Sequence, residues 1–408
     1  MSAVASRQCW LAILGIGEDG VEGLHAAARA LISGATLVVG GARHLALARP
    51  LVRGDFLAWP SPLNDAFPTI LARRGQPVAV LASGDPYCYG IGSSLARLIP
   101  PEETLCIPAP SAFSLASARL GWALQDTVTL SFCGRKLETI LPRLRPRARI
   151  LALSADSATP AAIAALLRAN GFGMSTLHIL EALGGPRERI RTTPASAELP
   201  RDIDKLNLLA IEVAAGPDAR IIPLAGGLPD ELFEHDGQIT KREVRAVTLS
   251  ALAPRAGELL WDVGCGSGSI AIEWSLCDSA NRAIGIEARS DRAARAARNA
   301  LALGVPDLEI IQGKVPAALV DLPTPNAVFI GGGAQDTGVV DAVWAALRPG
   351  GRIVVNAVTI ETEALLFAAQ QQRGGTMIRL SVDRLGSIGD MRGFCPARTV
   401  TQWAALKR

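Results

Sequence analysis

Short apolar runs rich in β-branched residues alternate with Ala-, Leu- and Arg-rich stretches of helical character along nearly the whole chain. This alternation predicts an α/β fold, because parallel strands are joined by crossovers that are usually helices. In the first half of the chain, strands are expected at Trp10–Leu14, Thr36–Val39, Pro77–Ala82, Thr104–Pro108, Thr127–Phe132, Arg149–Leu153, Ser175–Leu180 and Leu206–Val213. Helices are expected between several of these strands, at Val21–Ile32, Ile91–Ile99, Ser111–Leu120 and Pro160–Ala169.

The alternation lapses between Ala214 and Gln238, where glycines and prolines crowd together as they do in linkers. A second series follows, with a helix near Thr240–Leu252 and strands at Leu259–Val263, Ala283–Glu287, Leu308–Gln312, Ala327–Ile330 and Arg352–Val358. A chain of 408 residues is long enough for two or three domains of roughly 150 residues each. We therefore expect one domain at 1–213, a linker at 214–238 and a second domain at 239–408.

Composition and charge exclude several classes of protein. The formal net charge is only +3, whereas nucleic-acid-binding domains are usually strongly basic. No apolar run approaches the roughly 18 residues that span a bilayer, and Trp10–Leu14 is too short for the core of a signal peptide. The seven cysteines and four histidines have the spacing of neither a metal site nor a disulfide framework. We expect a cytoplasmic protein with an organic cofactor, no metal, no membrane contact and no nucleic-acid partner.

The sharpest local signal is a glycine-rich turn at Gly264–Gly268, which follows the hydrophobic strand Leu259–Val263 and opens a helix at Ile270–Leu276. Glycines let a backbone approach a ligand closely, and a helix N-terminus offers unpaired N–H groups. Glu287 ends the next expected strand, where a carboxylate would hydrogen-bond a ribose diol. The turn therefore predicts a binding site for a cofactor that contains a nucleoside.

The glycine spacing alone does not distinguish two such cofactors. Gly266, Gly268 and Ala271 also fit the loose pattern G-x-G-x-x-A, which is typical of dinucleotide sites. Leu347–Val355 lies after an expected helix and before an expected strand, and it looks like the later segment of seven-stranded S-adenosylmethionine methyltransferases. Together with the turn and Glu287, this segment favours S-adenosylmethionine over NAD.

Four further segments narrow the resemblance, namely Thr240–Arg245, Gly313–Pro316, Phe329–Gly333 and Asn356–Thr359. Together they resemble the decarboxylating precorrin methylases of cobalamin biosynthesis, which have the Rossmann-like fold of class I methyltransferases. By that resemblance the cofactor pocket includes Thr240, Gly264, Cys265, Gly266, Ser267, Gly268, Glu287 and Val315. Lys314 departs from the small or acidic residue that the resemblance predicts. Lys314, Asn356 and, in the first half, Arg135 are the candidates to position a substrate acetate.

A row of arginines follows Glu287, with Arg289, Arg292, Arg295 and Arg298 at intervals of three residues. At that spacing the four side chains lie near one face of a helix. Such a row is typical of a solvated surface helix. The alternative is a contact with carboxylates of the substrate or of a neighbouring subunit.

Three segments of the first half carry chemistry at expected strand ends, where α/β proteins bind ligands. Gly15–Gly20 follows the first strand, Ser83–Gly90 follows a strand of buried character, and Pro110–Ser114 opens a helix. In this order they resemble the tetrapyrrole methylases, the class III methyltransferases, whose two-lobed fold differs from that of class I. The precorrin branch that methylates a meso carbon is indicated by Ala118–Trp122, Leu130–Arg135 and Glu181–Pro186.

By this second resemblance, a second S-adenosylmethionine site is lined by Gly84, Asp85, Cys88, Ser111 and Ala112. Cys133 stands where the resemblance predicts a histidine. From the residues alone, Asp85 could instead be a turn carboxylate that accepts from its own backbone. Arg135 could cap a helix instead of binding a substrate carboxylate.

A chain that is similar to both kinds of methylase, with the tetrapyrrole methylase part first, resembles the bifunctional, decarboxylating precorrin C(5,15)-methyltransferases. They imply that the first domain methylates carbon 5 of precorrin-6B, and that the second methylates carbon 15 and removes carbon dioxide from a ring acetate to give precorrin-8. They also imply two independent S-adenosylmethionine sites, a polycarboxylate tetrapyrrole as substrate, and a homo-oligomer. The sequence does not identify the catalytic residues.

Three other functions compete with this interpretation. The first is a class I RNA methyltransferase with an N-terminal binding module, which the low aromatic content of 4% disfavours because bases stack on aromatic side chains. The second is a non-catalytic tetrapyrrole carrier, which the intact glycine turns disfavour. The third is an NAD-linked oxidoreductase, which would be stabilised by NAD and not by S-adenosylhomocysteine.

Overall fold

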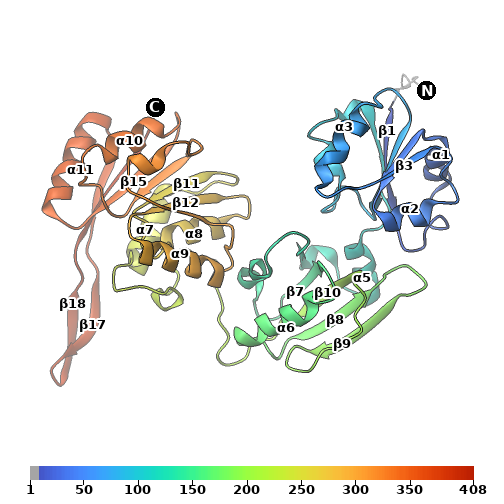
Figure 1. The fold of residues 1–408 in the computed structure, drawn as a ribbon. Helices are drawn as coiled ribbons and strands as arrows, with labels where there is room; N and C mark the ends of the chain where they lie inside the picture. The colour runs from blue at the N-terminus through green and yellow to red at the C-terminus, as the bar shows by residue number, and fades with distance from the viewer. Residues whose placement is uncertain (1–8) are drawn as a thin grey trace, which may run out of the picture. The chain divides into compact units, whose positions relative to one another are not determined.

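The computed structural model describes residues 9–408, and the chain divides into two compact units. The first unit extends to Leu137 and includes Arg145–Arg220, and the second comprises Glu138–Leu144 and Ile221–Arg408. Each unit is built from sheets and helices that alternate along the chain, as Figure 1 shows. The expected α/β class is confirmed.

The first unit opens with a five-stranded parallel sheet in the order β3-β2-β4-β1-β5. Its strands are β1 (Leu11–Ile16), β2 (Leu37–Gly40), β3 (Asp55–Ala58), β4 (Val78–Ser83) and β5 (Thr104–Ile107). The helices on one face are α1 (Ala26–Gly34) and α2 (Ala42–Ala48), and those on the other are α3 (Phe67–Leu71) and α4 (Gly92–Leu95). Leu14 and Leu11 of β1 pack on opposite faces, so the strand is apolar at every position.

The second sheet of this unit has mixed strand directions, in the order β6-β7-β10-β8-β9. Its strands are β6 (Thr127–Ser131), β7 (Arg149–Leu153), β8 (Thr176–Glu181), β9 (Arg189–Pro194) and β10 (Asn207–Glu212). The helices of this part are α5 (Ala112–Leu120) and α6 (Thr159–Ala169). Phe113 and Ala116 of α5 pack on one face of the sheet, against Leu151 and Leu208.

The second unit contains a seven-stranded sheet in the order β13-β12-β11-β14-β15-β19-β16. Its strands are β11 (Leu259–Val263), β12 (Arg282–Glu287), β13 (Glu309–Gln312), β14 (Ala327–Ile330), β15 (Arg352–Ala357), β16 (Thr376–Leu380) and β19 (Val400–Leu406). The first five are parallel, and β19 is antiparallel to both of its neighbours. The order of the parallel strands reverses between β11 and β14, which creates the crevice where open α/β sheets bind ligands.

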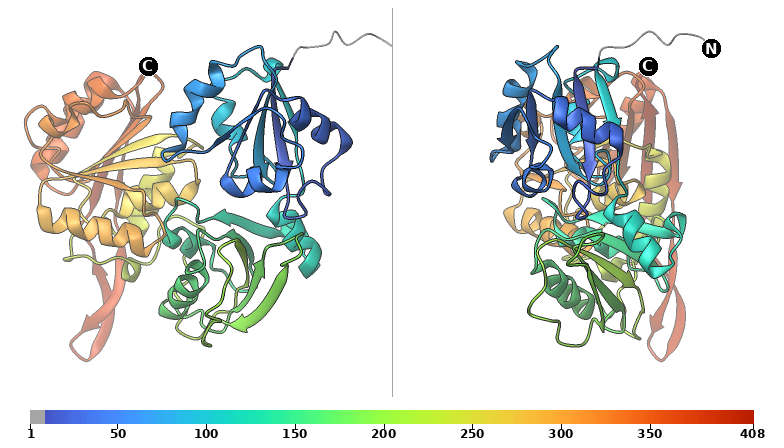
Figure 2. Two further views of the ribbon diagram at one scale, coloured as in Figure 1. Left: turned by 45° about the vertical axis from the view of Figure 1, so that its right-hand side comes forward. Right: turned by 90° about the vertical axis from the view of Figure 1, so that its right-hand side faces the viewer.

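Helices cover both faces of this sheet, as Figure 2 shows from two further directions. One face carries α10 (Val339–Ala346) and α11 (Ile360–Arg373). The other carries α7 (Arg242–Leu252) and α8 (Ser269–Cys277), and α9 (Ser290–Ala302) lies beside α8. Trp261 and Trp274 are fully buried in the two layers of core that result.

Two of the expected helices differ in the structure. The helix expected from Val21 begins only at Ala26, because residues 17–24 form hydrogen-bonded turns, including Leu24 N–H to the Val21 carbonyl. The helix expected at Ile91–Ile99 is reduced to α4, which begins at Gly92 and is followed by looser turns before Pro100. The edge strands β3 and β9 and all of β16–β19 were not expected from the sequence.

A buried ion pair fastens the glycine- and proline-rich segment to the second unit. The side chain of Arg245 on α7 is fully buried, and its guanidinium donates to Glu273 at 2.5 Å and to Asp230 at 3.0 Å. Glu273 in turn accepts from the backbone N–H groups of Gly227 and Leu228 at 2.6 and 2.9 Å. Arg245 also donates to the carbonyl oxygens of Leu228 and Thr240. Residues 227–240 are therefore held against α7 and α8.

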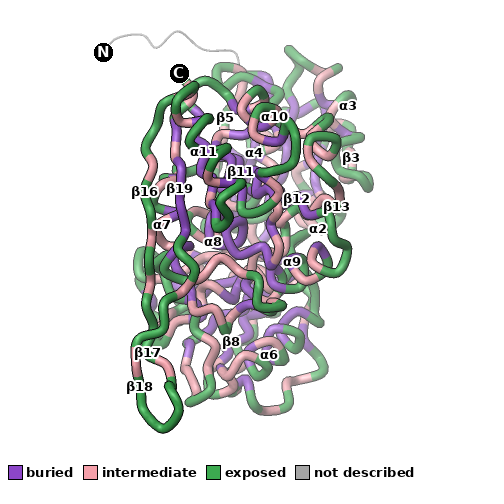
Figure 3. Tube along the Cα trace, turned by 90° about the vertical axis from the view of Figure 1, so that its left-hand side faces the viewer, coloured by how far each residue is buried: buried purple, intermediate pink, exposed green. Residues whose placement is uncertain are grey.

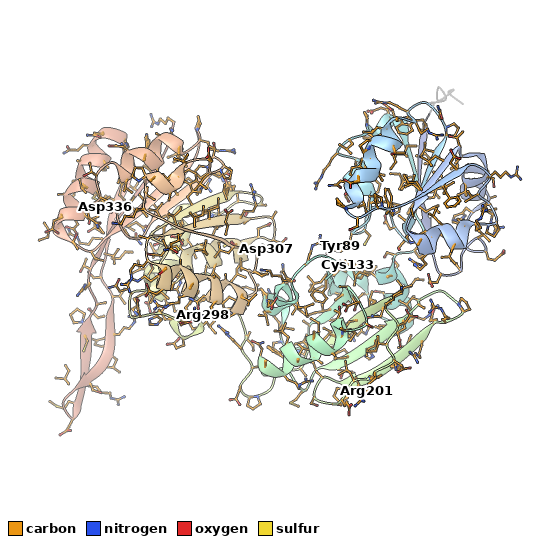
Figure 4. The ribbon with its side chains drawn as sticks, viewed as in Figure 1. Tyr89, Cys133, Arg201, Arg298, Asp307 and Asp336 are labelled. Carbon is orange, nitrogen blue, oxygen red and sulfur yellow. The ribbon has the colours of Figure 1, made fainter. Side chains whose placement is uncertain are left out.

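The arginine row on α9 has partners within its own chain. Arg292 and Arg295 pair with Asp236, and Arg298, which Figure 4 labels, pairs with Glu234. The two interpretations weighed from the sequence, a solvated helix face and a contact with substrate or subunit carboxylates, both miss this arrangement. The row instead ties residues 234–236 to α9.

A two-stranded hairpin, β17 (Asp383–Ile388) and β18 (Met391–Pro396), extends beyond the seven-stranded sheet in Figures 1 and 2. Figure 3 shows that it is exposed along its length. Leu385 lies opposite Phe394, and Ile388 lies opposite Met391. Because neighbouring residues of a strand point to opposite faces, each face of the hairpin carries one of these apolar pairs.

We predict that Arg245→Met lowers the free energy of unfolding of the second unit by about 3–5 kcal/mol, because the buried Glu273 carboxylate would lose its counterion and Asp230 would keep only Lys241, at 3.8 Å. Hydrogen exchange across α7 and α8 in rising urea would measure the loss. Arg298→Met is the matched control, since both partners of its ion pair are more than half exposed, and it should cost less than about 1 kcal/mol. Equal effects of the two substitutions would contradict this account.

Candidate functional site

One candidate site is a cavity of about 860 Å³ in the second unit. It lies at the carboxyl ends of β11, β12, β14 and β15, which is the crevice that the strand order creates. The sequence-predicted residues on its walls are Thr240, Gly264, Cys265, Gly266, Ser267, Glu287, Lys314, Val315 and Asn356. The structure thus brings together residues from segments that are far apart in the sequence.

The three glycines of the turn have different structural roles. Gly264 has a φ of +68°, and a Cβ there would lie 2.7 Å from the Gly332 carbonyl oxygen, so backbone packs on backbone. Gly268 does not line the cavity, and its missing side chain allows α8 to approach Ala296 of α9. At Gly266, with a φ of +56°, a Cβ would meet no atom closer than 3.9 Å. The open space beside Gly266 is therefore on the cavity side.

Glu287 is 6% exposed and holds the turn in place. Its Oε2 accepts from the Gly266 backbone N–H at 3.0 Å, and its Oε1 accepts from the Arg289 N–H, also at 3.0 Å. The carboxylate therefore joins the end of β12 to the glycine turn after β11. Its place at a strand end on the cavity wall fits the nucleoside-binding role expected from the sequence.

Asp262 is a wall residue that the sequence interpretation missed. It is 1% exposed, its Oδ2 accepts from the Ala271 N–H at 3.0 Å, and its Oδ1 has no partner. Burial, together with the nearby Glu287 carboxylate, raises the pKa of this carboxyl to about 7, although the hydrogen bond from Ala271 acts in the opposite direction. An acidic residue inside the hydrophobic strand Leu259–Val263 was the available signal.

A second part of the cavity wall comes from residues that flank the β17–β18 hairpin. Leu380 and Val382 precede the hairpin, and Ala397, Arg398 and Val400 follow it. Arg384 lies in β17 and pairs with Glu243 of α7. The sequence interpretation missed these residues because it contained no strand after Val358.

In the first unit, the structure brings together the three segments singled out at strand ends. The Gly84 N–H donates to the Ile16 carbonyl at 3.2 Å, and the Ala109 N–H donates to the Gly84 carbonyl at 3.1 Å. A Cβ on Gly15 would lie 1.9 Å from the Gly84 carbonyl oxygen, and one on Gly84 would lie 2.7 Å from the Pro110 carbonyl oxygen. Glycine is required at both positions because these backbones touch.

The predicted site residues of the first unit surround this junction. The Asp85 Oδ1 accepts from the Tyr87 N–H at 2.8 Å, which is the turn arrangement weighed from the sequence. The Cys88 N–H donates to the Asp85 carbonyl, and burial raises the pKa of the Cys88 thiol. Ser111 caps α5 by accepting from the Ser114 N–H at 3.1 Å, and Ala112 is the first residue of that helix.

Tyr89 and Arg135 contact each other in the first unit. Tyr89 has a φ of +55°, its hydroxyl donates to the Thr129 carbonyl at 3.2 Å, and the Arg135 guanidinium lies 5.1 Å from the centre of its ring. Arg135 therefore stacks on an aromatic ring and does not cap a helix. The Cys133 thiol donates to the Ser154 carbonyl at 3.4 Å, and Figure 4 labels both Cys133 and Tyr89.

A histidine that the sequence interpretation did not use lies beside the junction. The His44 Nε2 is 2.8 Å from the Ser83 hydroxyl and 2.8 Å from an Arg43 nitrogen. Arg43 also pairs with Glu18, which lies in the first glycine segment. Burial, together with the Arg43 charge, lowers the pKa of His44 to about 4, so its ring is neutral at pH 7.

The comparisons with known proteins agree with both glycine systems. Residues 11–198 match the tetrapyrrole (corrin/porphyrin) methylases, and residues 231–407 match the precorrin methyltransferase domain. The chain is thus an S-adenosylmethionine-dependent methyltransferase with a tetrapyrrole methylase part and a class I part.

Similar proteins narrow the class to one family. A precorrin-6Y C(5,15)-methyltransferase [decarboxylating] of a Sinorhizobium species is 54% identical over 98% of this chain and 96% of its own length. A protein of the same name from Mycobacterium tuberculosis is 39% identical over 97% of this chain and 99% of its own. The chain belongs to the decarboxylating precorrin-6Y C(5,15)-methyltransferase family.

Among solved structures, the C-terminal domain of a precorrin-6Y C5,15-methyltransferase from Rhodobacter capsulatus is 46% identical, covers 46% of this chain and 100% of its own, and has a TM-score of 0.44. Within residues 9–408, no helix has the length and apolar character needed to cross a bilayer. No group of three or more His, Cys, Asp or Glu side chains in that range could hold a metal ion.

The raised pKa of Asp262 makes the stability of the second unit depend on pH. Folding favours the protonated form, so the stabilising contribution is complete below about pH 4 and is lost as the pH rises through about 7. Asp262→Asn keeps an acceptor for Ala271 and cannot ionise. Between pH 4 and pH 8, the free energy of unfolding of this variant should rise by on the order of 2–4 kcal/mol relative to that of the wild type. Urea unfolding at several pH values would measure the difference, and a difference independent of pH would refute it.

Proposed function

We propose that this chain carries out the reaction named for its relatives, with two methyl transfers to a precorrin and the loss of one carbon dioxide. The substrate is precorrin-6B in the sequence-based expectation and precorrin-6Y in the names of the relatives. In this proposal residues 1–213 methylate carbon 5, and residues 239–408 methylate carbon 15 and decarboxylate a ring acetate. The observation that carries the proposal is the near full-length relationship together with a built cavity in the second unit.

The walls of that cavity fit S-adenosylmethionine. Gly266 leaves room for a ligand beside the backbone, Glu287 offers a carboxylate for ribose hydroxyls, and Thr240 and Val315 lie on the same walls. When bound, S-adenosylmethionine supplies an electrophilic methyl group on a positively charged sulfur. Backbone and apolar walls orient such a cofactor without a strong counterion, which would stabilise a charge that disappears during the transfer.

We propose a second S-adenosylmethionine site in the first unit, lined by Gly84, Asp85, Cys88, Ser111 and Ala112. The backbone junction of Gly15, Gly84 and Ala109 supports it, because such close packing fixes the loop after β4 beside the start of α5. Arg135, stacked on Tyr89, is exposed enough to meet a substrate carboxylate.

The chain's own residues would contribute mainly by positioning. Holding two reacting groups at attack distance can lower a barrier by as much as about 7–11 kcal/mol. Lys314 and Asn356 on the cavity wall are the proposed contacts to substrate carboxylates in the second unit. Mass spectrometry of the tetrapyrrole product tests the whole proposal, which requires two added methyl groups and one lost carbon dioxide.

Gly266→Arg should separate the two activities. The new side chain would extend into the open space beside the turn and block the second site, while the first unit is unchanged. We expect the product to gain one methyl group and lose no carbon dioxide. Calorimetry with S-adenosylhomocysteine should find two sites per wild-type chain and one per variant chain. Normal methylation of carbon 15 by the variant, or one site in the wild type, would show that the assignment is wrong.

We also propose that the chain forms a homo-oligomer and that the β17–β18 hairpin contributes to it. An isolated two-stranded hairpin is marginally stable in water, and this one exposes Leu385, Ile388, Met391 and Phe394 by 57–75%. Contact with another copy would bury these side chains.

Replacing Met391 and Phe394 together by lysine should disrupt that contact. Analytical ultracentrifugation should give a mass above 42.7 kDa for the wild type and a mass near that of one chain for the variant. The matched control is Ile360→Lys, which charges an apolar side chain that is 82% exposed but lies outside the hairpin. A wild-type chain that sediments as a monomer would rule out this part of the proposal.

A further inference from the structure

A buried chain of hydrogen bonds lies behind the cavity wall of the second unit. The Gln402 Nε2 donates to the Asn356 Oδ1 at 2.9 Å and to the Thr248 hydroxyl at 3.0 Å. The Asn356 Nδ2 also donates to the Thr248 hydroxyl, at 3.0 Å, and Thr248 donates to the Val244 carbonyl at 2.8 Å. Thr248 and Gln402 are 0% and 2% exposed and do not line the cavity, whereas Asn356 does.

The donors and acceptors in this chain determine the orientation of the Asn356 amide. Thr248 has a single hydroxyl proton, which goes to the Val244 carbonyl, so its oxygen accepts from both amides. Both Nε2 hydrogens of Gln402 are used. If the Asn356 amide were turned over, its Nδ2 would face the Nε2 of Gln402, with a donor against a donor. The second Nδ2 hydrogen of Asn356, a residue on the cavity wall, has no hydrogen-bond partner within the described residues.

We propose that this N–H of Asn356 holds the carboxylate of the ring acetate that leaves as carbon dioxide, and that Thr248 and Gln402 are positioning residues for it. The inference rests on the proposed function and extends it to the group that the site must orient. Asn356 lies near the end of β15, opposite Gln402 of β19, and directly follows Val355, which pairs with Ile330 of β14. The hydrogen-bond chain then fixes its side chain.

A neutral donor suits this step. In the decarboxylation, the bond between the acetate CH₂ and its carboxylate breaks, the electron pair moves into the conjugated ring system, carbon dioxide leaves, and a proton from water completes the methyl group. A guanidinium or ammonium group against this carboxylate would stabilise the negative charge that has to leave it. A single amide N–H orients the carboxylate with less stabilisation of the ground state.

Positively charged side chains on the wall of the same cavity are available to bind the other carboxylates of the substrate. Lys314 and Arg398 line the cavity, and neither makes an ion pair within the described residues. Arg384 and Lys241 also line it but already pair with Glu243 and Asp230. The cavity therefore offers a neutral donor at Asn356 and uncommitted positive charges elsewhere on its wall.

Thr248→Val and Thr248→Ser are the variants that test this inference. Valine has nearly the same shape but offers no acceptor, so the Asn356 amide keeps only its contact with Gln402 and is held less firmly, while serine keeps the hydroxyl. We expect Thr248→Val to lower the kcat of carbon dioxide release about tenfold to a hundredfold. Thr248→Ser should restore most of that loss. In both variants, the affinity for S-adenosylhomocysteine and the methylation of carbon 5 should stay within about twofold of the wild type.

The outcomes separate this inference from the proposed function. If the wild type releases carbon dioxide and both Thr248 variants release it at the same rate, the inference alone is overturned. Equal losses in the valine and serine variants would overturn it as well. A wild-type chain that releases no carbon dioxide would overturn the proposed function as well. If Thr248→Val does not fold, Asn356→Asp replaces the remaining donor with a carboxylate oxygen. That variant should lose carbon dioxide release while carbon 5 is still methylated, and normal release would overturn the inference.

Discussion

Direct contact of backbone with backbone at the ends of parallel strands is the constraint on which both halves of this chain depend. In the first unit, Gly15 and Gly84 leave no room for a side chain where three segments meet. In the second, Gly264 is packed in the same way against the Gly332 carbonyl. These contacts place loops from different parts of the sequence at one edge of each sheet, and the candidate binding residues lie on those loops.

The second unit adds an electrostatic fastening to this backbone framework. Arg245 and Glu273 are buried together, and between them they bind five groups of the segment from Gly227 to Thr240. A buried pair of this kind adds little net stability compared with apolar packing, but removal of one partner is costly. The pair instead fixes the position of Thr240, which is on the cavity wall and whose carbonyl accepts from Arg245.

Much of the framework could be predicted from the sequence, because apolar runs of parallel strands are buried on both faces and stand out from the helices between them. Strands such as β11 and β14, at Leu259–Val263 and Ala327–Ile330, were expected at the bounds that they have. β3 and β9 were missed because edge strands carry exposed and charged residues, as at Arg189. The hairpin was missed for the same reason, and with it Arg384 and Arg398 on the cavity wall.

The pairing of side chains was harder to predict from the sequence than the positions of the strands. Spacing placed the arginines of α9 on one face, but their partners Glu234 and Asp236 lie more than 50 residues earlier in the chain. The same limit hid Gln402 behind Asn356, because β19 joins the sheet antiparallel beside β15 from the far end of the sequence. A glycine turn can be recognised from a short stretch of sequence, whereas these side-chain contacts join segments that come together only in the folded sheet.

The position of the hairpin has a consequence for how this enzyme can be tuned. Both of its stems continue directly into segments that line the cavity, through Val382 on one side and Ala397 on the other. The hairpin and this part of the cavity wall are therefore continuous in the chain. By reciprocity, a contact at the hairpin that raised the affinity of the cavity for a ligand would itself be strengthened by that ligand by the same factor.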